Sequence, residues 1–185
     1  LTYNVQNLFD ALVTGNEYPE YPPESQWTVE KYRRRLEQTS RAITQAHRHL
    51  PDIVVLQEIE HVGVLEDLLS GPLATRRYQW YAATSDADSA IQTGVCSAHP
   101  IREARIHALE GLRSVLEVSI DINGEEITLF ALHAKSKREG TQETEEDRLE
   151  LTRMLGRRTD AILTESPFMP IVIAGDFNES ADAFF

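Results

Sequence analysis

One short apolar run and the four residues after it constrain this chain more than any other feature. Residues 171–174 predict a buried strand, and Gly175-Asp176-Phe177-Asn178 follows it directly. In open α/β sheets, ligands bind just beyond the carboxyl ends of the strands. An Asp at such a place offers hard oxygens to a cation such as Mg²⁺, and an Asn can orient water or a phosphate without adding charge. Taken alone, the tetrapeptide fits a plain turn equally well.

Three other strand-like runs also end in polar residues that can bind metal or phosphate. These residues are Asn4 in residues 2–5, Gln57 and Glu58 after residues 53–56, and His133, Lys135 and Ser136 after residues 127–132. One polar strand end needs no special explanation. Four of them, with side chains of these kinds, predict a single shared site.

In their order along the chain, these segments resemble the endonuclease/exonuclease/phosphatase superfamily, which has the DNase I-like fold. The matching motifs are Asn4-x-x-Asn7-Leu8-Phe9, Gln57-Glu58, Thr93-Gly94-Val95, Ser97-x-His99-Pro100-Ile101, Arg113, His133-x-Lys135-Ser136 and Gly175-Asp176-Phe177-Asn178. Gln-Glu alone is a weak signal, but the ordered set is specific and spans nearly the whole chain. The resemblance implies an α/β fold, a four-layer α/β sandwich of two packed mixed β-sheets flanked by helices.

The resemblance also implies that part of the domain is missing. Members of the superfamily end with a further Asp and a Ser-Asp-His motif, whereas only seven residues follow Asn178 here and none of them is His. The chain also opens with Leu1 inside a strand-like run. We therefore expect residues 1–185 to form a single domain that is truncated at both ends.

The resemblance implies metal-site roles for three residues. Glu58 is expected to be the principal ligand of Mg²⁺, with Mn²⁺ as the alternative ion, because Mg²⁺ typically takes one or two carboxylates. Asn4 is expected to help hold this metal site. Asp176 would orient or deprotonate the attacking water, or ligate a second ion. Without its companions, Glu58 would be interpreted as an exposed loop acid.

Substrate contacts are implied for three more residues. Asn178 would hold the attacking water or a phosphate oxygen, and His133 would contact the phosphate with a charge that is tunable near neutral pH. Arg113 is a candidate phosphate contact, because its planar fork suits bidentate binding. His133 could instead cap a strand end, and Arg113 could be a surface residue. The other five histidines show no metal-ligand spacing, and we interpret them as structural: His47, His49, His61, His99 and His107.

Helices and strands are expected to alternate along the chain. The expected helices cover residues 28–50, 61–70 and 143–164, and further strands cover 78–82, 93–98, 114–121 and 126–132, with a hairpin turn at Asn123-Gly124. We expect the basic face of the first helix, which includes Arg35, to be solvated. Residues 7–27 predict an aromatic loop, either packed by its own side chains or facing the substrate.

Composition adds weaker constraints on function. Thirty acidic and eighteen basic residues give a net charge of −12, which argues mildly against tight duplex DNA binding. It does not argue against a metal-dependent nuclease, because bound cations reverse the local charge. No apolar run has the length of a membrane span, so we expect no stable membrane insertion. The single cysteine, Cys96, excludes an intramolecular disulfide and is expected to be buried.

We expect a Mg²⁺-dependent phosphodiester hydrolase, an endonuclease or other nuclease acting on nucleic acid. The segment from Asn4 to Phe9 resembles bacterial members usually described as nucleases, whereas abasic-site endonucleases usually carry Tyr in place of His133. The first alternative is a phosphatase or phospholipase C-type hydrolase of a small or lipid phosphoester. The second is a non-catalytic binding module. We expect a monomer, and the sequence leaves cytoplasmic and secreted locations both open.

Overall fold

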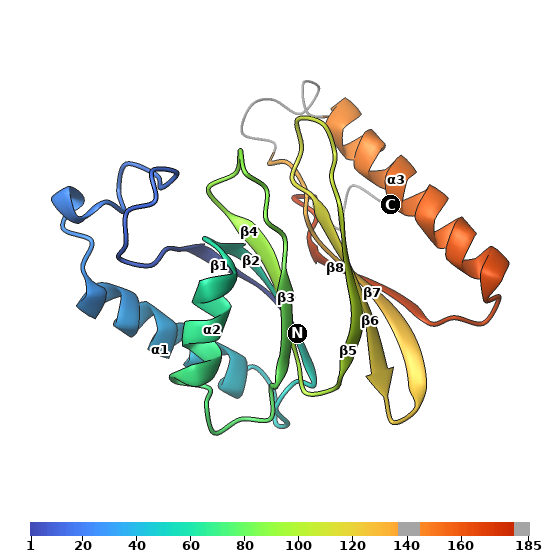
Figure 1. The fold of residues 1–185 in the computed structure, drawn as a ribbon, viewed down its shortest axis with the longest axis horizontal. Coiled ribbons are helices and arrows are strands. Elements are labelled where there is room, and N and C mark those ends of the chain that lie inside the picture. Colours follow the sequence, from blue (N-terminus) through green and yellow to red (C-terminus); the bar gives the residue numbers. More distant parts are fainter. Residues whose placement is uncertain (137–144, 180–185) are drawn as a thin grey trace.

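Two four-stranded β-sheets pack face to face, and helices cover their outer surfaces (Figure 1). The structure is a computed structural model, and it describes residues 1–136 and 145–179. The layers run from helices through the two sheets to a further helix, which confirms the expected four-layer α/β sandwich. Within this described part, no helix is both long and apolar enough to cross a membrane.

The first sheet mixes parallel and antiparallel pairs. Its strands, in spatial order, are β1 (Thr2–Leu8), β2 (Ile53–Ile59), β4 (Gln92–Ser97) and β3 (Trp80–Ala83). β1 and β2 run parallel, and the other pairs are antiparallel. A 3-10 helix at Pro23–Ser25 precedes α1 (Val29–Gln45), which lies with α2 (Val62–Ser70) on the outer face of this sheet.

The second sheet has a similar plan. Its strands are β5 (Ile101–His107), β6 (Val115–Ile122), β7 (Glu125–His133) and β8 (Ile171–Asp176), and α3 (Glu145–Glu165) covers its outer face. Only β7 and β8 run parallel. Asn123 and Gly124 both have positive φ, as a tight hairpin turn requires, so the predicted turn between β6 and β7 is confirmed.

Apolar side chains fill three layers of contact. Val55 and Val95 from the first sheet meet Val118 and Leu129 from the second in the centre. α1 packs against the first sheet through Tyr32, Leu36 and Ile43. α3 packs against the second sheet through Leu151, Met154, Leu155 and Ile162. Cys96 is buried in the first of these outer layers, as predicted, and burial raises the pKa of its thiol to about 12.

Several element boundaries differ from the prediction. α1 begins at Val29, after the N-cap Thr28, but ends at Gln45 and not at residue 50. β3 begins at Trp80, and β5 was not predicted at all. β5 is an edge strand with mostly exposed side chains, so its sequence lacks the apolar pattern of a buried strand. Residues 171–174 form the predicted strand, β8, but the prediction that it is buried was wrong, because β8 is an edge strand with Val172 and Ile173 44% and 40% exposed. The predicted start of the last helix, at residue 143, lies outside the described residues.

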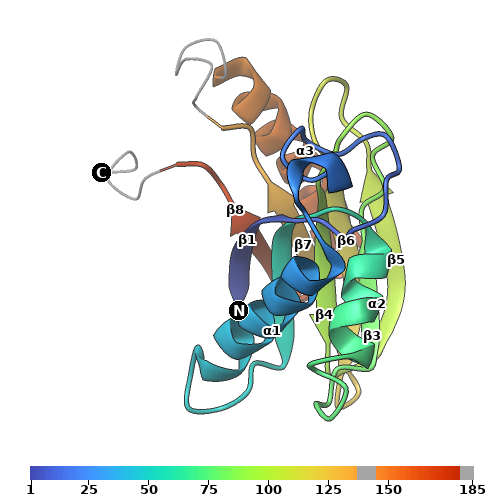
Figure 2. The same cartoon turned by 90° about the vertical axis from the view of Figure 1, so that its left-hand side faces the viewer.

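The topology brings four strand ends to one edge of the sandwich. β1 and β8, which are edge strands of different sheets, contact each other and lie side by side (Figure 2). β2 runs parallel to β1, and β7 runs parallel to β8. The four runs singled out in the sequence are therefore neighbours in space, and their polar ends converge.

Candidate active site at the strand ends

Backbone irregularities in β1 and β2 open the site. The regular pairing of the two strands stops after Asn4 and Gln57, and both strands bulge beyond that point. Gln6, Asn7 and Glu58 have φ of 56°, 60° and 66°. Positive φ is uncommon outside glycine and costs about 1–3 kcal/mol per residue. Three such residues at one level of two paired strands indicate that the packing around them enforces this geometry.

Asn4 joins carboxylates from both sheets. Its Nδ2 donates to Oε1 of Glu58 at 2.9 Å and to Oδ2 of Asp176 at 3.0 Å. The backbone N–H of Asn7 donates to the other oxygen of Glu58, Oε2, at 3.0 Å. Asn7, the second Asn of the Asn4-x-x-Asn7 motif, thus contacts Glu58 through its backbone. The two carboxylates are thus held close together with a single amide group between them.

His133 lies beside this pair and is buried. Its Nε2 is 3.7 Å from Oε1 of Glu58, and its Nδ1 is buried with no hydrogen-bond partner among the described residues. Burial and, second, the positive charge of Arg113 lower the pKa of His133, although Glu58 and Asp176 oppose that shift. The ring is therefore neutral near pH 7. A buried polar atom without a partner in a site requires a water, ion or substrate group to satisfy it.

Asp176 and Asn178 form a turn at the end of β8. The N–H of Asn178 donates to Oδ1 of Asp176 at 2.9 Å, and its Nδ2 donates to the carbonyl of Ala134 at 2.8 Å. Burial would raise the pKa of Asp176, but hydrogen bonds from Asn4 and Asn178 outweigh it, so the pKa lies below its usual value. Asp176 is therefore ionised at neutral pH.

Arg113 reaches the same corner from the loop before β6. Its guanidinium donates to the carbonyl of Ala134 at 3.4 Å, the group that also accepts from Asn178. Arg113 also lines a cavity of about 420 Å³ together with Asp86, Ser89, Leu109 and Lys135. All six predicted site residues thus lie in one region: Asn4, Glu58, Arg113, His133, Asp176 and Asn178.

Gln57 and Lys135 each contact a residue outside this group of six. Gln57 is buried, and its Nε2 donates to the hydroxyl of Thr2 at 3.2 Å, so its side chain braces β1 and makes no hydrogen bond to Glu58. Lys135 pairs with Asp147 of α3 at 3.2 Å.

Sequence reasoning missed the part played by Arg35. We predicted a solvated position on α1, but its guanidinium donates to the carbonyls of Val5 and Gln6, the latter at 2.9 Å. These carbonyls belong to the bulge that carries Asn4 and Asn7. No local sequence signal distinguishes Arg35 from the neighbouring arginines, because its partners lie 29 and 30 residues away.

Comparison with known proteins bears on the family and the fold of this chain. A family profile described as Endonuclease/Exonuclease/phosphatase family matches residues 1–183. No curated protein sequence matches the chain. Among solved structures, similarity extends to Staphylococcus aureus beta toxin (TM-score 0.65, 16% identity, 97% of this chain and 65% of that chain). Sphingomyelinase C from Streptomyces griseocarneus is also similar (0.61, 21%, 80% and 60%), as is truncated TDP2 from Caenorhabditis elegans (0.61, 15%, 80% and 56%).

The sequence identity to each of these solved structures is below 25%, so the similarity shows the fold alone. The chain spans only about half the length of the C. elegans TDP2 structures that it matches, between 45% and 56%. The family profile, in contrast, covers the chain almost from end to end and agrees with the ordered motifs and the converging strand ends. The chain belongs to the endonuclease/exonuclease/phosphatase family.

Proposed function

We propose that this chain contributes the metal site and phosphate contacts of a Mg²⁺-dependent phosphodiester hydrolase whose substrate is nucleic acid. The observation that carries the proposal is the convergence of Glu58, Asn4 and Asp176 from three strands and two sheets. Both side chains are partly exposed, so an ion from solvent can reach the two carboxylates, which one amide group holds close together.

The donor set fits Mg²⁺. Glu58 and Asp176 supply hard carboxylate oxygens, and a Mg²⁺ site typically uses one or two of these while water fills the remaining positions. Glu58 would hold the ion, supported by Asn4, and Asp176 would complete the site or hold the attacking water. Mn²⁺ is the alternative ion. When bound, the ion would neutralise charge on the phosphoryl oxygens and on the leaving oxygen.

The remaining roles belong to the chain's own side chains. Asp176 is ionised and can accept a proton from water at Oδ1 or Oδ2, and Asn178 is fixed by Ala134 at a position where it can orient that water. His133 is neutral, so one of its ring nitrogens can donate to a phosphate oxygen. Arg113 can neutralise the same phosphate with its planar fork.

Nucleic acid is the first substrate class, because D. rerio TDP2, a protein of similar fold, is known in complex with a single-strand DNA product. A phosphoester of a lipid or small molecule is the second. The structural likeness to sphingomyelinase C and the net charge of −12, which disfavours phosphate-rich duplexes, support this second class.

The test is metal-dependent hydrolysis by the full-length protein. Plasmid DNA, a single-stranded oligonucleotide, a phosphomonoester panel and sphingomyelin are assayed side by side, with Mg²⁺ and with chelator. We expect DNA cleavage that requires Mg²⁺ and falls at least ~100-fold in Glu58→Gln, as for loss of a group that stabilises the transition state. Glu66→Gln, which removes an exposed carboxylate on α2, is the matched control and should keep full activity.

Intact DNA with hydrolysis of sphingomyelin or a phosphomonoester would move the protein to the second substrate class. An absence of hydrolysis in every assay would refute the enzymatic proposal. The non-catalytic binding module would then be the remaining interpretation. DNA cleavage that persists undiminished in Glu58→Gln would show that Glu58 does not hold the essential ion.

A further inference from the structure

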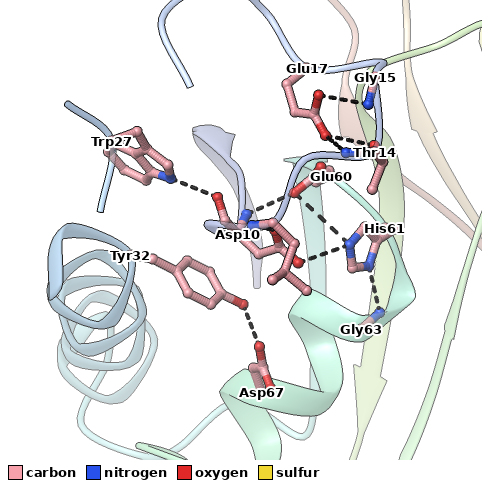
Figure 3. A network of polar contacts seen from close by, with 11 residues as sticks. Asp10, Thr14, Gly15, Glu17, Trp27, Tyr32, Glu60, His61, Gly63 and Asp67 are labelled. Carbon is pink, nitrogen blue, oxygen red and sulfur yellow. Dashed lines mark hydrogen bonds and ion pairs between the residues drawn. The ribbon is translucent and has the colours of Figure 1, made fainter. Parts of the chain in front are cut away.

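A second cluster of ligand groups lies where the loop after β1 meets the start of α2 (Figure 3). Asp10, Glu60 and His61 each place one ligand atom within 4.8 Å of the others. Oδ2 of Asp10 is 3.2 Å from Nε2 of His61, and Oε2 of Glu60 is 3.9 Å from the same nitrogen. The side chains of Asp10 and Glu60 are only 9% and 6% exposed, whereas His61 is 41% exposed and opens the cluster to solvent.

The backbone around this cluster is held by hydrogen bonds. The N–H of Glu60 donates to the carbonyl of Leu8 at 3.0 Å, and the N–H of Asp10 donates to Oε2 of Glu60 at 2.7 Å. His61 is the N-cap of α2, and its Nδ1 accepts from the N–H of Gly63 at 3.1 Å. The three ligand groups are thus fixed on an ordered frame.

One buried atom in the cluster has no partner. The N–H of Leu12 donates to Oδ1 of Asp10 at 2.6 Å, but Oε1 of Glu60 is buried and accepts no hydrogen bond among the described residues. Two buried carboxylates therefore face one imidazole, and an oxygen of one of them is unsatisfied. An uncompensated buried carboxylate is strongly unfavourable, and a cation bound by the Glu60 carboxylate, whose Oε2 lies 3.9 Å from Nε2 of His61, would compensate it.

We propose that Asp10, Glu60 and His61 bind a divalent cation of the Zn²⁺ class. Zn²⁺ accepts both imidazole nitrogen and carboxylate oxygen at about 2.0–2.2 Å, and ligand atoms 3.2 and 3.9 Å apart can surround one ion at that distance. Mg²⁺, in contrast, prefers oxygen ligands. The open side of His61 leaves room for water as the fourth ligand. This site is separate from the one proposed at Glu58 and does not depend on it.

Ion binding changes the hydrogen-bonding of His61. Because Nδ1 accepts from Gly63, the ring hydrogen lies on Nε2 and is donated to Asp10 in this structure. An ion at Nε2 requires this hydrogen to move to Nδ1, with no net loss of a proton. The N–H of Gly63 then loses its acceptor. The shift of one backbone amide at the start of α2 is therefore a signature of an ion at this site.

The ion would fasten the aromatic loop to the first sheet. Phe9 stacks on Tyr21 with ring centroids 4.4 Å apart, and Nε1 of Trp27 donates to the carbonyl of Asp10 at 2.7 Å. Asp10 lies near the start of the loop of residues 7–27, and Trp27 at the end of that loop contacts it. Both ends of the loop are therefore next to the cluster. Trp27 is a natural reporter, because its indole N–H contacts a residue that binds the ion.

The experiment is a Zn²⁺ titration of the chelator-treated full-length protein, followed by calorimetry and by the NMR signal of the Trp27 indole N–H, which donates to the carbonyl of Asp10. His47 and His49 are exposed neighbours at the end of α1, with ring centroids 6.3 Å apart, so both are changed to Gln to remove adventitious binding there. We expect saturable binding that reaches Trp27, weakened at least ~10–100-fold in Glu60→Gln and Asp10→Asn. Glu66→Gln is the matched control with unchanged affinity.

A second readout keeps the proposal testable if Glu60→Gln does not fold. In NMR spectra, a Zn²⁺ concentration that just saturates the parent should shift the Gly63 amide and the His61 ring nitrogens there, and should shift them much less in Asp10→Asn. Equal affinity in the parent, Glu60→Gln and Asp10→Asn, or no saturable binding at all, would overturn the proposal. Glu58→Gln should retain Zn²⁺ binding at this cluster while losing hydrolysis, so failure here and failure of the proposed function are distinguishable.

Discussion

At the scale of the residue, single backbone conformations aim the candidate site. Glu58 reaches Asn4 because β2 bulges at a residue with positive φ. Gly175 permits the close approach of β8 to β7 just before Asp176, since it lies opposite Leu132 with φ of 154°. A Cβ at Gly175 would lie 2.0 Å from the carbonyl oxygen of Leu132. The glycine of Gly-Asp-x-Asn is therefore required by the backbone around it.

Two glycine substitutions should consequently have opposite effects on stability. Gly175→Ala must separate β7 from β8, and we expect a loss of at least about 1–3 kcal/mol in the free energy of unfolding. Gly156→Ala lies in α3 with open space around it, so it should gain about 0.5–1 kcal/mol. Urea denaturation of both variants and the parent measures the free energy of unfolding of each. Equal stability of Gly175→Ala and the parent would contradict the close approach.

At the scale of the element, α1 supports the bulge of β1. Arg35 donates to two carbonyls of that bulge, which carries Asn4 toward Glu58. On the basic face of α1, we therefore expect Arg35 to position the bulge of β1.

Arg35→Met should therefore lower hydrolysis more than it lowers stability. The substitution keeps much of the apolar stem and removes the donors to Val5 and Gln6. We expect a decrease in kcat of about 10-fold or more, because misplacement of a catalytic group by about 1 Å can cost on the order of 100-fold. Arg34→Met, on the exposed side of α1, is the matched control. A shift in KM alone, with kcat unchanged, would rule out this positioning role.

An ion pair adds to the apolar contact between α3 and the second sheet. Glu117 on β6 accepts from Arg158 of α3 at 2.7 and 2.8 Å and contacts Nε2 of His107 at 2.6 Å. Burial would raise the pKa of Glu117, but the hydrogen bonds from Arg158 and His107 outweigh it and lower the pKa. The folded state therefore favours the ionised carboxylate.

The ion pair of Glu117 predicts a pH-dependent contribution to the free energy of unfolding. Since the pKa of Glu117 is lower in the folded chain, its contribution is complete above the usual value of 4.5 and is lost as pH falls through the folded value. Glu117→Gln should thus be less stable than the parent by about 1–3 kcal/mol at pH 7, and the difference should shrink below pH 4. Thermal unfolding from pH 7 to pH 3 tests this, and a constant difference would exclude it.

At the scale of the whole molecule, the site joins the two sheets. Asn4 of the first sheet bonds Asp176 of the second, and His133 of the second lies beside Glu58 of the first. An ion held by Glu58 and Asp176 would therefore stabilise the packing of one sheet on the other.

Mg²⁺ should raise the melting temperature of the full-length protein. At an ion concentration 100 times Kd, the stabilisation is about 2.7 kcal/mol, and at 10 times Kd it is about 1.4 kcal/mol. Glu58→Gln should lose this increase and keep the one produced by Zn²⁺. A Mg²⁺ effect of equal size in Glu58→Gln would place the ion elsewhere.

The sequence by itself determined the parts of this protein that depend on local pattern. Apolar runs followed by Glu58, His133 and Asp176 predicted strands whose ends carry site residues, and the order of the motifs predicted the fold. Only the tertiary structure decided which of those residues meet. It turned Gln57 toward Thr2, gave Arg35 its partners on β1, and brought His61, which we had interpreted as structural, to Asp10. The physical reason is that strand identity follows from neighbouring side chains, whereas these contacts join residues 29 to 55 positions apart and depend on bulges and loop paths that no local period encodes.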